Sequence, residues 1–474
     1  MTRRLLVPTA ASLLSALLTA CSGSNSNGDN NAIPANAQSE LGVFVIVVDS
    51  LMPGEIGAAL TPTPTIAGIR DAGTQYTESR AVFSAETLPN HAAMMTGVYP
   101  ETNGIPTNNY WSRQGEPEDR DLSLPTELEA LTLFTRIKAE CPNIRTAAAL
   151  SKDYLYELFS ACGFSGSDCG INVAPDIHFD PTADPTFIPQ PAGLTPDVST
   201  MQAALDALPN ADFMFINLGQ VDRMGHADET GVTGTPLFRN LVMQDTDLQI
   251  QRFIQALQSA GRWDKSIVFI VSDHGMDWST PLNFVNTSPV TEPLGLFAIQ
   301  NGGTNSYYVT NPLDPMRDSK LMLARTALLA TPGVENAWYR ELNPADPGIN
   351  TLLPSHFHAR HENFGDLVAS ATEGFRFSEP SQQSNPIPGN HGHKLTLHNT
   401  FMIGGGAPFV RAQTISEPDE PVDHFEQRAA QSENVDVAPT VAWLFGMSTA
   451  GFEGRVLSEA FSIASPPSLC GVPR

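Results

Sequence analysis

Three apolar runs of strand type each lead to an acidic residue. Val43 to Val48 ends at Asp49, Phe213 to Leu218 leads to Asp222, and Ile267 to Val271 leads to Asp273. Side chains that follow neighbouring strands of a sheet meet at one edge of it. We therefore expect the three carboxylates to gather there as metal ligands.

Helical patterns alternate with these runs. Residues 65–76 suit a short helix, and an apolar stripe from Leu248 to Leu257 ends near Gly261 and leads to a strand at 266–272. This alternation predicts one large α/β domain over 41–465, with a mostly parallel central sheet flanked by helices.

The segment 305–390 breaks this rhythm. It contains a possible strand at 305–310 and a helix around Lys320 to Ala330, followed by stretches rich in Pro, Gly, Ser and Gln. We expect it to form a cap or insertion beside the site. Residues 466–474 are expected to be a C-terminal tail.

The charge of the chain excludes one class of partner. It carries 51 acidic and 26 basic residues, for a formal net charge of −25. Nucleic-acid binding needs a basic surface, so we expect none. An anionic substrate would need local positive charge, and bound divalent cations are the obvious source.

The N-terminus has the pattern of an export signal. Arg3 and Arg4 precede a short apolar stretch, and Leu18-Thr19-Ala20-Cys21 resembles the end of a bacterial lipoprotein signal. Residues 1–20 would be removed, lipidated Cys21 would attach the chain to a membrane, and 21–40 would be a flexible tether. Ser22 favours the outer membrane of the cell envelope, facing the periplasm or the exterior. An ordinary signal peptide is the alternative.

The remaining four cysteines suit an oxidising compartment. Export and an even number predict two disulfides among Cys141, Cys162, Cys169 and Cys470. Cys162 and Cys169 enclose a short loop and are the first expected pair. A zinc-thiolate site is the competing reading.

Thr87 is the candidate nucleophile. It starts the segment Thr87-Leu88-Pro89-Asn90-His91, which reads as the beginning of a helix that ends at Gly97. A threonine alkoxide at a helix N-terminus, beside a divalent cation, is stabilised by the dipole and by free amides. A plain helix-capping threonine is the alternative.

Two histidines join these carboxylates in a mixed carboxylate and imidazole set. Asp222 and His226 are four residues apart and share one face of a helical turn, while Asp273 and His274 share a site only if the chain turns there, as Gly275 permits. Such sets suit zinc in catalytic sites.

The residues together resemble the type I phosphodiesterase and nucleotide pyrophosphatase family of the alkaline phosphatase superfamily. The resemblance covers about residues 41–465. It rests on Phe83 to His91 with Thr96-Gly97-Val98-Tyr99-Pro100, Asn103-Gly104-Ile105, Val221-Asp222 with Gly225-His226, Ser272 to Met276, Gly389 to Gly392, Asn434 to Thr440 and Glu453 to Leu457.

The resemblance implies an alkaline-phosphatase-like fold and two Zn²⁺ ions, although other divalent metals are possible. Asp49, Asp273 and His274 would hold one ion, which would also activate Thr87. Asp222, His226 and His391 would hold the other. Asn108 and the Thr87 amide would bind a phosphoryl oxygen, and a phospho-threonine would form and be hydrolysed.

Two departures from the family stand near the ligands, and a third concerns the substrate. Ser50 replaces a common Gly, and Asn103 replaces a His. The segment Ala149 to Leu155 resembles the lysine-bearing segment of phosphonoacetate hydrolases, with Tyr154 in place of the second lysine. Lys152 would then contact a carboxylate or a terminal phosphate; an exposed lysine at a helix start is the alternative.

We therefore expect an exported zinc-dependent hydrolase of small phosphate esters or nucleotides, of the phosphodiesterase type. A phosphomonoesterase or phosphonate hydrolase is the main alternative, and a non-catalytic binding lipoprotein is a third. Thr87 disfavours a sulfatase, which needs a modifiable Cys or Ser.

The other histidines are expected to be structural. His91 and His398 would be hydrogen-bonded, and His393 is a weaker candidate ligand than His391. The cluster His356, His358 and His361 would be a solvated loop, with an extra metal site as the alternative.

Overall fold

The structure is a computed structural model that describes residues 41–280, 283–378, 388–418 and 431–465. The expected signal segment, the tether with Cys21, the C-terminal tail and Cys470 lie outside the described residues. Among the helices that are described, none combines the length and the apolar character needed to cross a membrane.

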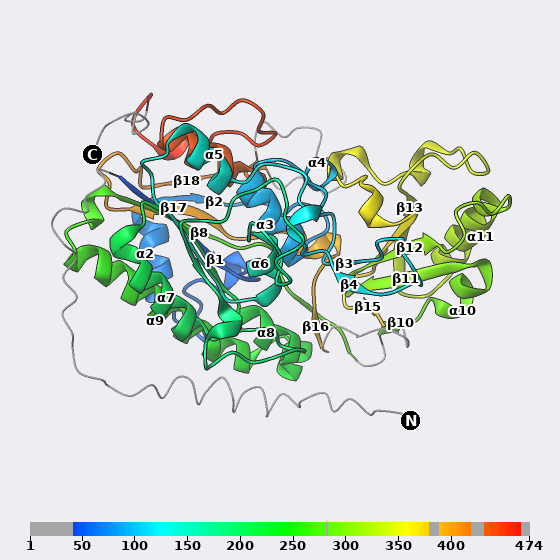
Figure 1. Cartoon of the computed structure of the whole chain (residues 1–474). Coiled ribbons are helices and arrows are strands. Elements are labelled where there is room, and N and C mark those ends of the chain that lie inside the picture. Colours follow the sequence, from blue (N-terminus) through cyan, green and yellow to red (C-terminus); the bar gives the residue numbers. More distant parts are fainter. Residues whose placement is uncertain (1–40, 281–282, 379–387, 419–430, 466–474) are drawn as a thin grey trace.

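An eight-stranded sheet forms the centre of the molecule (Figure 1). Five neighbouring strands run parallel in the order β8-β1-β7-β5-β6, and β17 pairs antiparallel with β8 and β2. The predicted mostly parallel sheet is confirmed. The strands are β1 (Gly42–Val48), β2 (Thr74–Tyr76), β5 (Thr146–Leu150), β6 (Ile177–Phe179), β7 (Phe213–Leu218), β8 (Ser266–Val271), β17 (Phe401–Gly405) and β18 (Gln413–Ile415).

Alternate side chains of β1 enter two separate cores. Val43, Val45 and Val47 pack on the face covered by α3 (Thr87–Thr96), α5 (Leu133–Glu140) and α12 (Val437–Leu444). Phe44 and Ile46 pack on the opposite face, which is covered by α2 (Pro64–Ala72), α7 (Asp197–Ala207), α8 (Gln220–Ala227) and α9 (Leu237–Ser259). Burial on both faces explains why the strand is apolar throughout.

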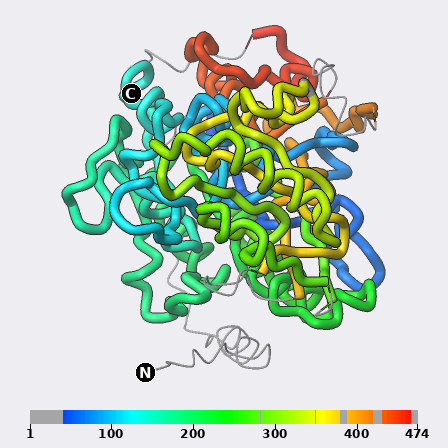
Figure 2. Tube along the Cα trace, turned by 90° about the vertical axis from the view of Figure 1, so that its right-hand side faces the viewer, coloured from blue at the N-terminus to red at the C-terminus, as the bar shows by residue number. Residues whose placement is uncertain are grey.

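A second, four-stranded antiparallel sheet lies beside the first. Its order is β11-β12-β14-β13, formed by β11 (Leu296–Asn301), β12 (Thr304–Val309), β13 (Val334–Tyr339) and β14 (Leu367–Ala371), and α10 (Ser288–Thr291) and α11 (Arg317–Leu329) flank it. It occupies the right-hand side of Figure 1 and faces the viewer in Figure 2. The expected strand at 305–310 and helix at 320–330 are both present.

The remaining short elements lie outside these two sheets. They are α4 (Pro100–Asn103), α6 (Asp153–Leu158) and the paired strands β3 (Asn109–Tyr110) with β4 (Arg120–Asp121), β9 (Asp277–Trp278) with β16 (Gly389–Asn390), and β10 (Phe284–Val285) with β15 (Arg376–Phe377).

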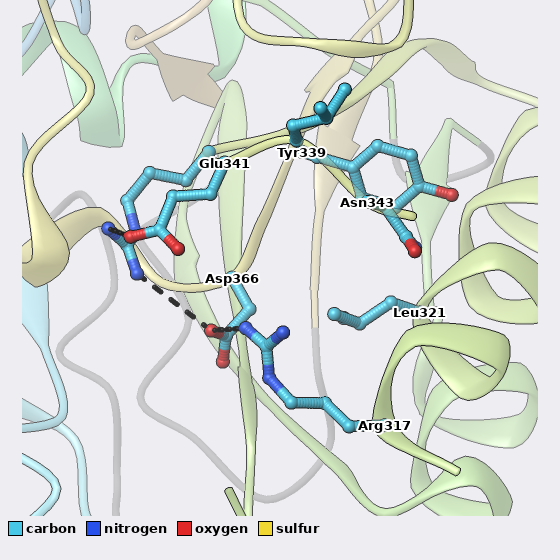
Figure 3. A pocket seen from close by; sticks show the side chains of 8 residues that line it. Arg317, Leu321, Tyr339, Glu341, Asn343 and Asp366 are labelled. Atoms are coloured by element: carbon cyan, nitrogen blue, oxygen red, sulfur yellow. Dashed lines mark hydrogen bonds and ion pairs between the residues drawn. The ribbon is translucent and has the colours of Figure 1, made fainter. Parts of the chain in front are cut away.

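A pocket lies in the region of the second sheet, lined by residues of α11, by the segment that follows β13, and by Asp366 (Figure 3). Asp366 is already paired, with Arg317 Nη2 at 2.9 Å and Arg113 Nη1 at 3.1 Å. No predicted site residue lines this pocket, so we assign the chemistry elsewhere.

The structure tests the predicted disulfides and the helix predicted at residues 65–76. Cys162 and Cys169 form the predicted disulfide, and Cys141 is also disulfide-bonded. The predicted helix at 65–76 is wrong at its end, because α2 stops at Ala72 and Tyr76 belongs to β2. Gly73 allows this switch: a Cβ there would lie 2.4 Å from the Ile403 carbonyl oxygen, so only glycine lets the chain pass.

Candidate active site

Thr87 lies at the start of α3, with its side chain buried. The capping position is Glu86 and Thr87 is the first residue of the helix, so the alternative of a plain helix-capping threonine is wrong by one residue. The helix ends at Gly97, whose φ of 69° is left-handed, as the sequence predicts. Thr87 Oγ1 is 3.2 Å from Lys152 Nζ and 3.4 Å from His274 Nε2. The hydroxyl therefore faces a cluster of charged and imidazole groups.

Asn108 is oriented towards the same place by two hydrogen bonds. Its Oδ1 accepts a hydrogen bond from the backbone N–H of Leu88 at 2.8 Å, and its backbone N–H donates to the Glu86 carboxylate at 2.6 Å. The Nδ2 group has no acceptor among the described residues. The geometry thus leaves a donor free beside Thr87, which suits the expected contact with a phosphoryl oxygen.

Each of the three predicted carboxylate ligands keeps one buried oxygen without a hydrogen-bond partner in the described part of the chain. These atoms are Asp49 Oδ1, Asp222 Oδ1 and Asp273 Oδ2. Buried oxygens normally find a partner, and an unmet one costs about 1–3 kcal/mol. Three such atoms close together fit a site that is completed by cations.

The three predicted histidine ligands all point Nε2 inwards. The Nδ1 atoms of His226, His391 and His274 contact the carbonyl oxygens of Gly389 (2.8 Å), Ala85 (3.1 Å) and Gly275 (2.9 Å). Each Nδ1 must donate, which leaves a lone pair on Nε2. His226 and His391 face each other through these lone pairs at 3.2 Å, a contact that a cation bound by both would resolve.

The six predicted ligand residues therefore form two neighbouring groups. Asp222, His226 and His391 make one compact candidate metal site. In the other, His274 Nε2 lies 3.3 Å from Asp273 Oδ2 and 3.8 Å from Asp49 Oδ1. The donor atoms fit zinc, with imidazole nitrogens and carboxylate oxygens.

The ligand groups overlap more than the sequence implied. Asp49 and His274 also form a compact set with Asp222, and Asp49 and Asp273 form one with His91. His91, however, has both ring nitrogens engaged: Nδ1 contacts the Thr87 carbonyl at 2.9 Å and Nε2 contacts Asn217 Nδ2 at 3.0 Å. His91 is hydrogen-bonded, as expected. We therefore keep the two ligand sets that the resemblance implies, neither of which includes His91.

Lys152 lies in the centre of the site and is fully buried. Its Nζ is 2.8 Å from Asp49 Oδ2 and 2.9 Å from Asp222 Oδ2. The alternative of an exposed lysine is therefore wrong. Burial lowers the pKa of Lys152, but Asp222 and Asp49 outweigh it and hold that pKa above its usual value. The raised pKa favours the ammonium form, which lies 3.2 Å from the Thr87 hydroxyl oxygen.

Burial shapes the protonation of the other groups. It lowers the pKa of His226 to about 4 and that of His391 well below its usual value, which keeps both imidazoles neutral. Burial and then the neighbouring Asp49 raise the pKa of Asp273. Burial also raises the pKa of Asp222, but Lys152 and the histidines reverse this and hold it below its ordinary range. Neutral imidazoles with crowded carboxylates are what a metal site requires.

The remaining histidines lie outside this arrangement. His393 Nε2 pairs with Asp277 Oδ2 at 3.1 Å, so His391 and not His393 reaches the site. His358 stacks on Tyr99 at 4.4 Å, and His361 Nδ1 accepts the Asn363 amide. No candidate metal group among the described residues includes the 356–361 cluster.

Two residues that hydrogen-bond to the predicted site residues were not predicted from the sequence. Asn217 donates to Asp49 Oδ2 at 3.0 Å and contacts His91, and Glu86 accepts from the Asn108 amide and from Thr304 Oγ1 at 3.0 Å. The signal for Asn217 was a polar residue inside an otherwise apolar buried strand. Glu86 gave no signal beyond its place next to Thr87.

The site and fold define a class of protein: an α/β protein with a candidate nucleophile at a helix start and two adjacent candidate metal groups at the ends of sheet strands. The family model for type I phosphodiesterase / nucleotide pyrophosphatase matches residues 43–394. The chain belongs to this family, within the alkaline phosphatase superfamily.

Individual relatives agree. The chain is 22% identical to bovine (Bos taurus) bis(5'-adenosyl)-triphosphatase ENPP4 over 388 residues, which is 79% of this chain and 72% of that protein. It is 21% identical to human ectonucleotide pyrophosphatase/phosphodiesterase family member 5 over 362 residues, 73% of this chain and 65% of that protein.

Solved structures share the fold. Murine ectonucleotide pyrophosphatase/phosphodiesterase 5 superposes with a TM-score of 0.65 at 17% identity, covering 89% of this chain and all of that one. The human protein gives 0.66 at 16% identity with the same coverage. An inactive form of the murine protein has been solved in complex with AMP.

Proposed function

We propose that the chain is a zinc-dependent hydrolase of small phosphate esters or nucleotides, of the phosphodiesterase type, which acts through a phospho-threonine at Thr87. The observation that carries the proposal is the convergence of Thr87 Oγ1, the free Asn108 donor and two groups of metal-ligand atoms. Family membership and the AMP complex of the murine relative support nucleotides as substrates.

The residues divide the chemistry between them. Thr87 Oγ1 attacks phosphorus and gives up its proton to solvent, the new Oγ–P bond forms, and the bond to the leaving oxygen breaks, with that oxygen taking a proton from solvent. Water then cleaves the Oγ–P bond, which releases the phosphate product and restores the Thr87 hydroxyl. Asn108 Nδ2 and the Thr87 amide would hold phosphoryl oxygens. Two cations bound by Asp49, Asp273, His274 and by Asp222, His226, His391 would supply Lewis acidity for the attacking and leaving oxygens.

Lys152 supports the second candidate, a phosphomonoesterase or phosphonate hydrolase. Its ammonium group lies 3.2 Å from the nucleophile, where it would stabilise an extra negative charge on the substrate. Tyr154, in place of a second lysine, has its ring 5.8 Å from Lys152 Nζ. Tyr154 supplies no ammonium group where the phosphonoacetate-hydrolase segment has its second lysine, and we keep the diester as our first choice.

Substrate comparison separates the two candidates. We expect kcat/KM to be highest for a p-nitrophenyl phosphodiester, lower for the monoester and lowest for phosphonoacetate. Lys152→Ala is expected to reduce kcat/KM for all three substrates. The reduction is expected to be roughly tenfold larger for the monoester than for the diester, because the monoester loses about 1.4 kcal/mol more charge stabilisation than the diester. Lys138→Ala, at an exposed ion pair with Asp176, is the matched control. A diester that is the poorest substrate would replace our first choice with the second.

We also propose that the chain is an envelope lipoprotein attached through Cys21. The support is the export pattern at 1–21 and the disulfide at Cys162–Cys169, which suits an oxidising compartment. In a bacterial host, the wild-type chain is expected in the membrane fraction and to incorporate labelled palmitate. Cys21→Ala is expected to lose the label, and retention of the label would contradict lipidation at this residue.

A further inference from the structure

Arg239, near the start of α9, is a fully buried guanidinium outside the ligand sets. Its charge is compensated by Glu55, with Nε 2.8 Å from Oε1 and Nη2 2.8 Å from Oε2. Burying an arginine is costly unless it is paired in this bidentate way. Glu55 therefore compensates the buried charge of Arg239. The guanidinium N–H groups that do not bond Glu55 are free to bond other parts of the chain.

Those donors bond the neighbours of two candidate metal ligands. Nη1 donates to Ser50 Oγ at 2.8 Å and to the Val221 carbonyl at 3.0 Å, and Nη2 donates to the Ser50 carbonyl at 2.7 Å. Ser50 follows Asp49, and Val221 precedes Asp222. One planar fork thus connects the chain beside one ligand group with the chain beside the other.

Ser50 extends the connection to a third ligand. Its amide donates to Asp273 Oδ1 at 2.9 Å, which orients that carboxylate. The Ser50 backbone is left-handed, with φ of 63°, a conformation that favours glycine. The hydrogen bond from Arg239 to Ser50 Oγ offers a reason for a serine here, since a glycine would lack the hydroxyl that accepts it.

Gly225 shows how closely α8 approaches the same guanidinium. A Cβ added there would lie 2.9 Å from Arg239 Nη1, so the helix turn between Asp222 and His226 packs directly on the fork. The Arg239 amide also donates to Asp228 Oδ2 at 2.9 Å, just beyond α8. The chain segments next to both candidate ligand groups therefore contact Arg239.

We infer that Arg239 is a positioning residue that sets the separation and orientation of the two candidate metal groups. The inference rests on the metal site proposed above, and it assigns a role to a residue that contacts neither substrate nor metal. Partners that orient ligands in this way typically change metal affinity or activity by about 10–100-fold when they are removed.

Arg239→Met tests the inference because it removes the fork and keeps an apolar stem. The metal-free protein is titrated with zinc against a chromogenic chelator, and kcat and KM are measured on the zinc-loaded protein. We expect zinc affinity to fall about tenfold or more, with kcat reduced and KM near that of the wild type. Arg239→Lys is expected not to restore either, since an ammonium group cannot reproduce the fork.

Arg252→Met, on the same helix, is the matched control, because Arg252 bonds only Gln249 and Gln202 among the described residues. A purely structural role predicts a lower melting temperature with unchanged zinc affinity and kcat, and that result would overturn the inference. If Arg239→Met does not fold, Ser50→Ala removes one acceptor and keeps the Glu55 pair. Unchanged zinc affinity in that variant would also overturn it. A wild-type chain that binds no zinc would overturn the proposed metal site itself.

Discussion

Replacing Thr87 with alanine is expected to reduce kcat for a p-nitrophenyl phosphate ester by roughly 10³-fold or more. The variant removes the only hydroxyl within hydrogen-bond reach of both Lys152 Nζ and His274 Nε2 in the described site. Any residual rate would come from water attacking a substrate that Asn108 and the ligand groups still hold. KM is therefore expected to change much less than kcat.

Two controls make the result specific. Thr87→Ser keeps a hydroxyl at the same position and is expected to retain measurable turnover. Thr96→Ala removes a buried hydroxyl at the other end of α3, where Thr96 Oγ1 donates to the Ala92 carbonyl at 2.7 Å, and is expected to stay within a fewfold of the wild type. Turnover by Thr87→Ala equal to that of Thr96→Ala would refute the nucleophile assignment.

Asp222→Asn is expected to have an effect of similar size, by a different route. Asp222 belongs to the compact group with His226 and His391, and its Oδ1 has no hydrogen-bond partner among the described residues. An amide is a weaker zinc ligand than a carboxylate and carries no charge, so we expect the zinc content to fall from two ions to one per chain. The lost Lewis acidity is expected to lower kcat by about 10³-fold.

The control for this variant is Asp247→Asn. Asp247 is a carboxylate that accepts the amides of Thr65 and Ile66 at the start of α2, away from the ligand groups. Asparagine keeps one acceptor oxygen, so at most one of these two bonds is lost, and we expect a cost of about 1 kcal/mol of stability without a change in zinc content. Two zinc ions per chain in Asp222→Asn, measured by elemental analysis, would show that Asp222 is not a ligand.

Local patterns were sufficient to predict the central sheet and the residues at its edge. The run Val43 to Val48 is a strand because it is buried on both faces, and Asp222 and His226 share a face because they are four residues apart in α8. Gly97 ends α3 because its left-handed conformation is cheap only for glycine.

The features that the sequence did not predict depend on contacts between distant segments. The segment Ala149 to Leu155 suggested a substrate contact for Lys152, but nothing in it indicates that the ammonium group reaches Asp49 and Asp222. Likewise, nothing near Arg239 indicates that it bonds Ser50. Tyr76 has an apolar helical spacing from Ile69, yet pairing with Phe401 of β17 places it in a strand. Tertiary pairing overrides local periodicity at such positions.

The most direct test of the central claim is a zinc titration of the metal-free wild-type chain, followed by the initial rate of p-nitrophenyl phosphodiester hydrolysis. The proposed site predicts little hydrolysis without metal and a rate that rises with zinc and levels off at two ions per chain. Full hydrolysis in a sample shown to contain no metal, or no hydrolysis of diester, monoester or phosphonoacetate at two zinc ions per chain, would contradict it.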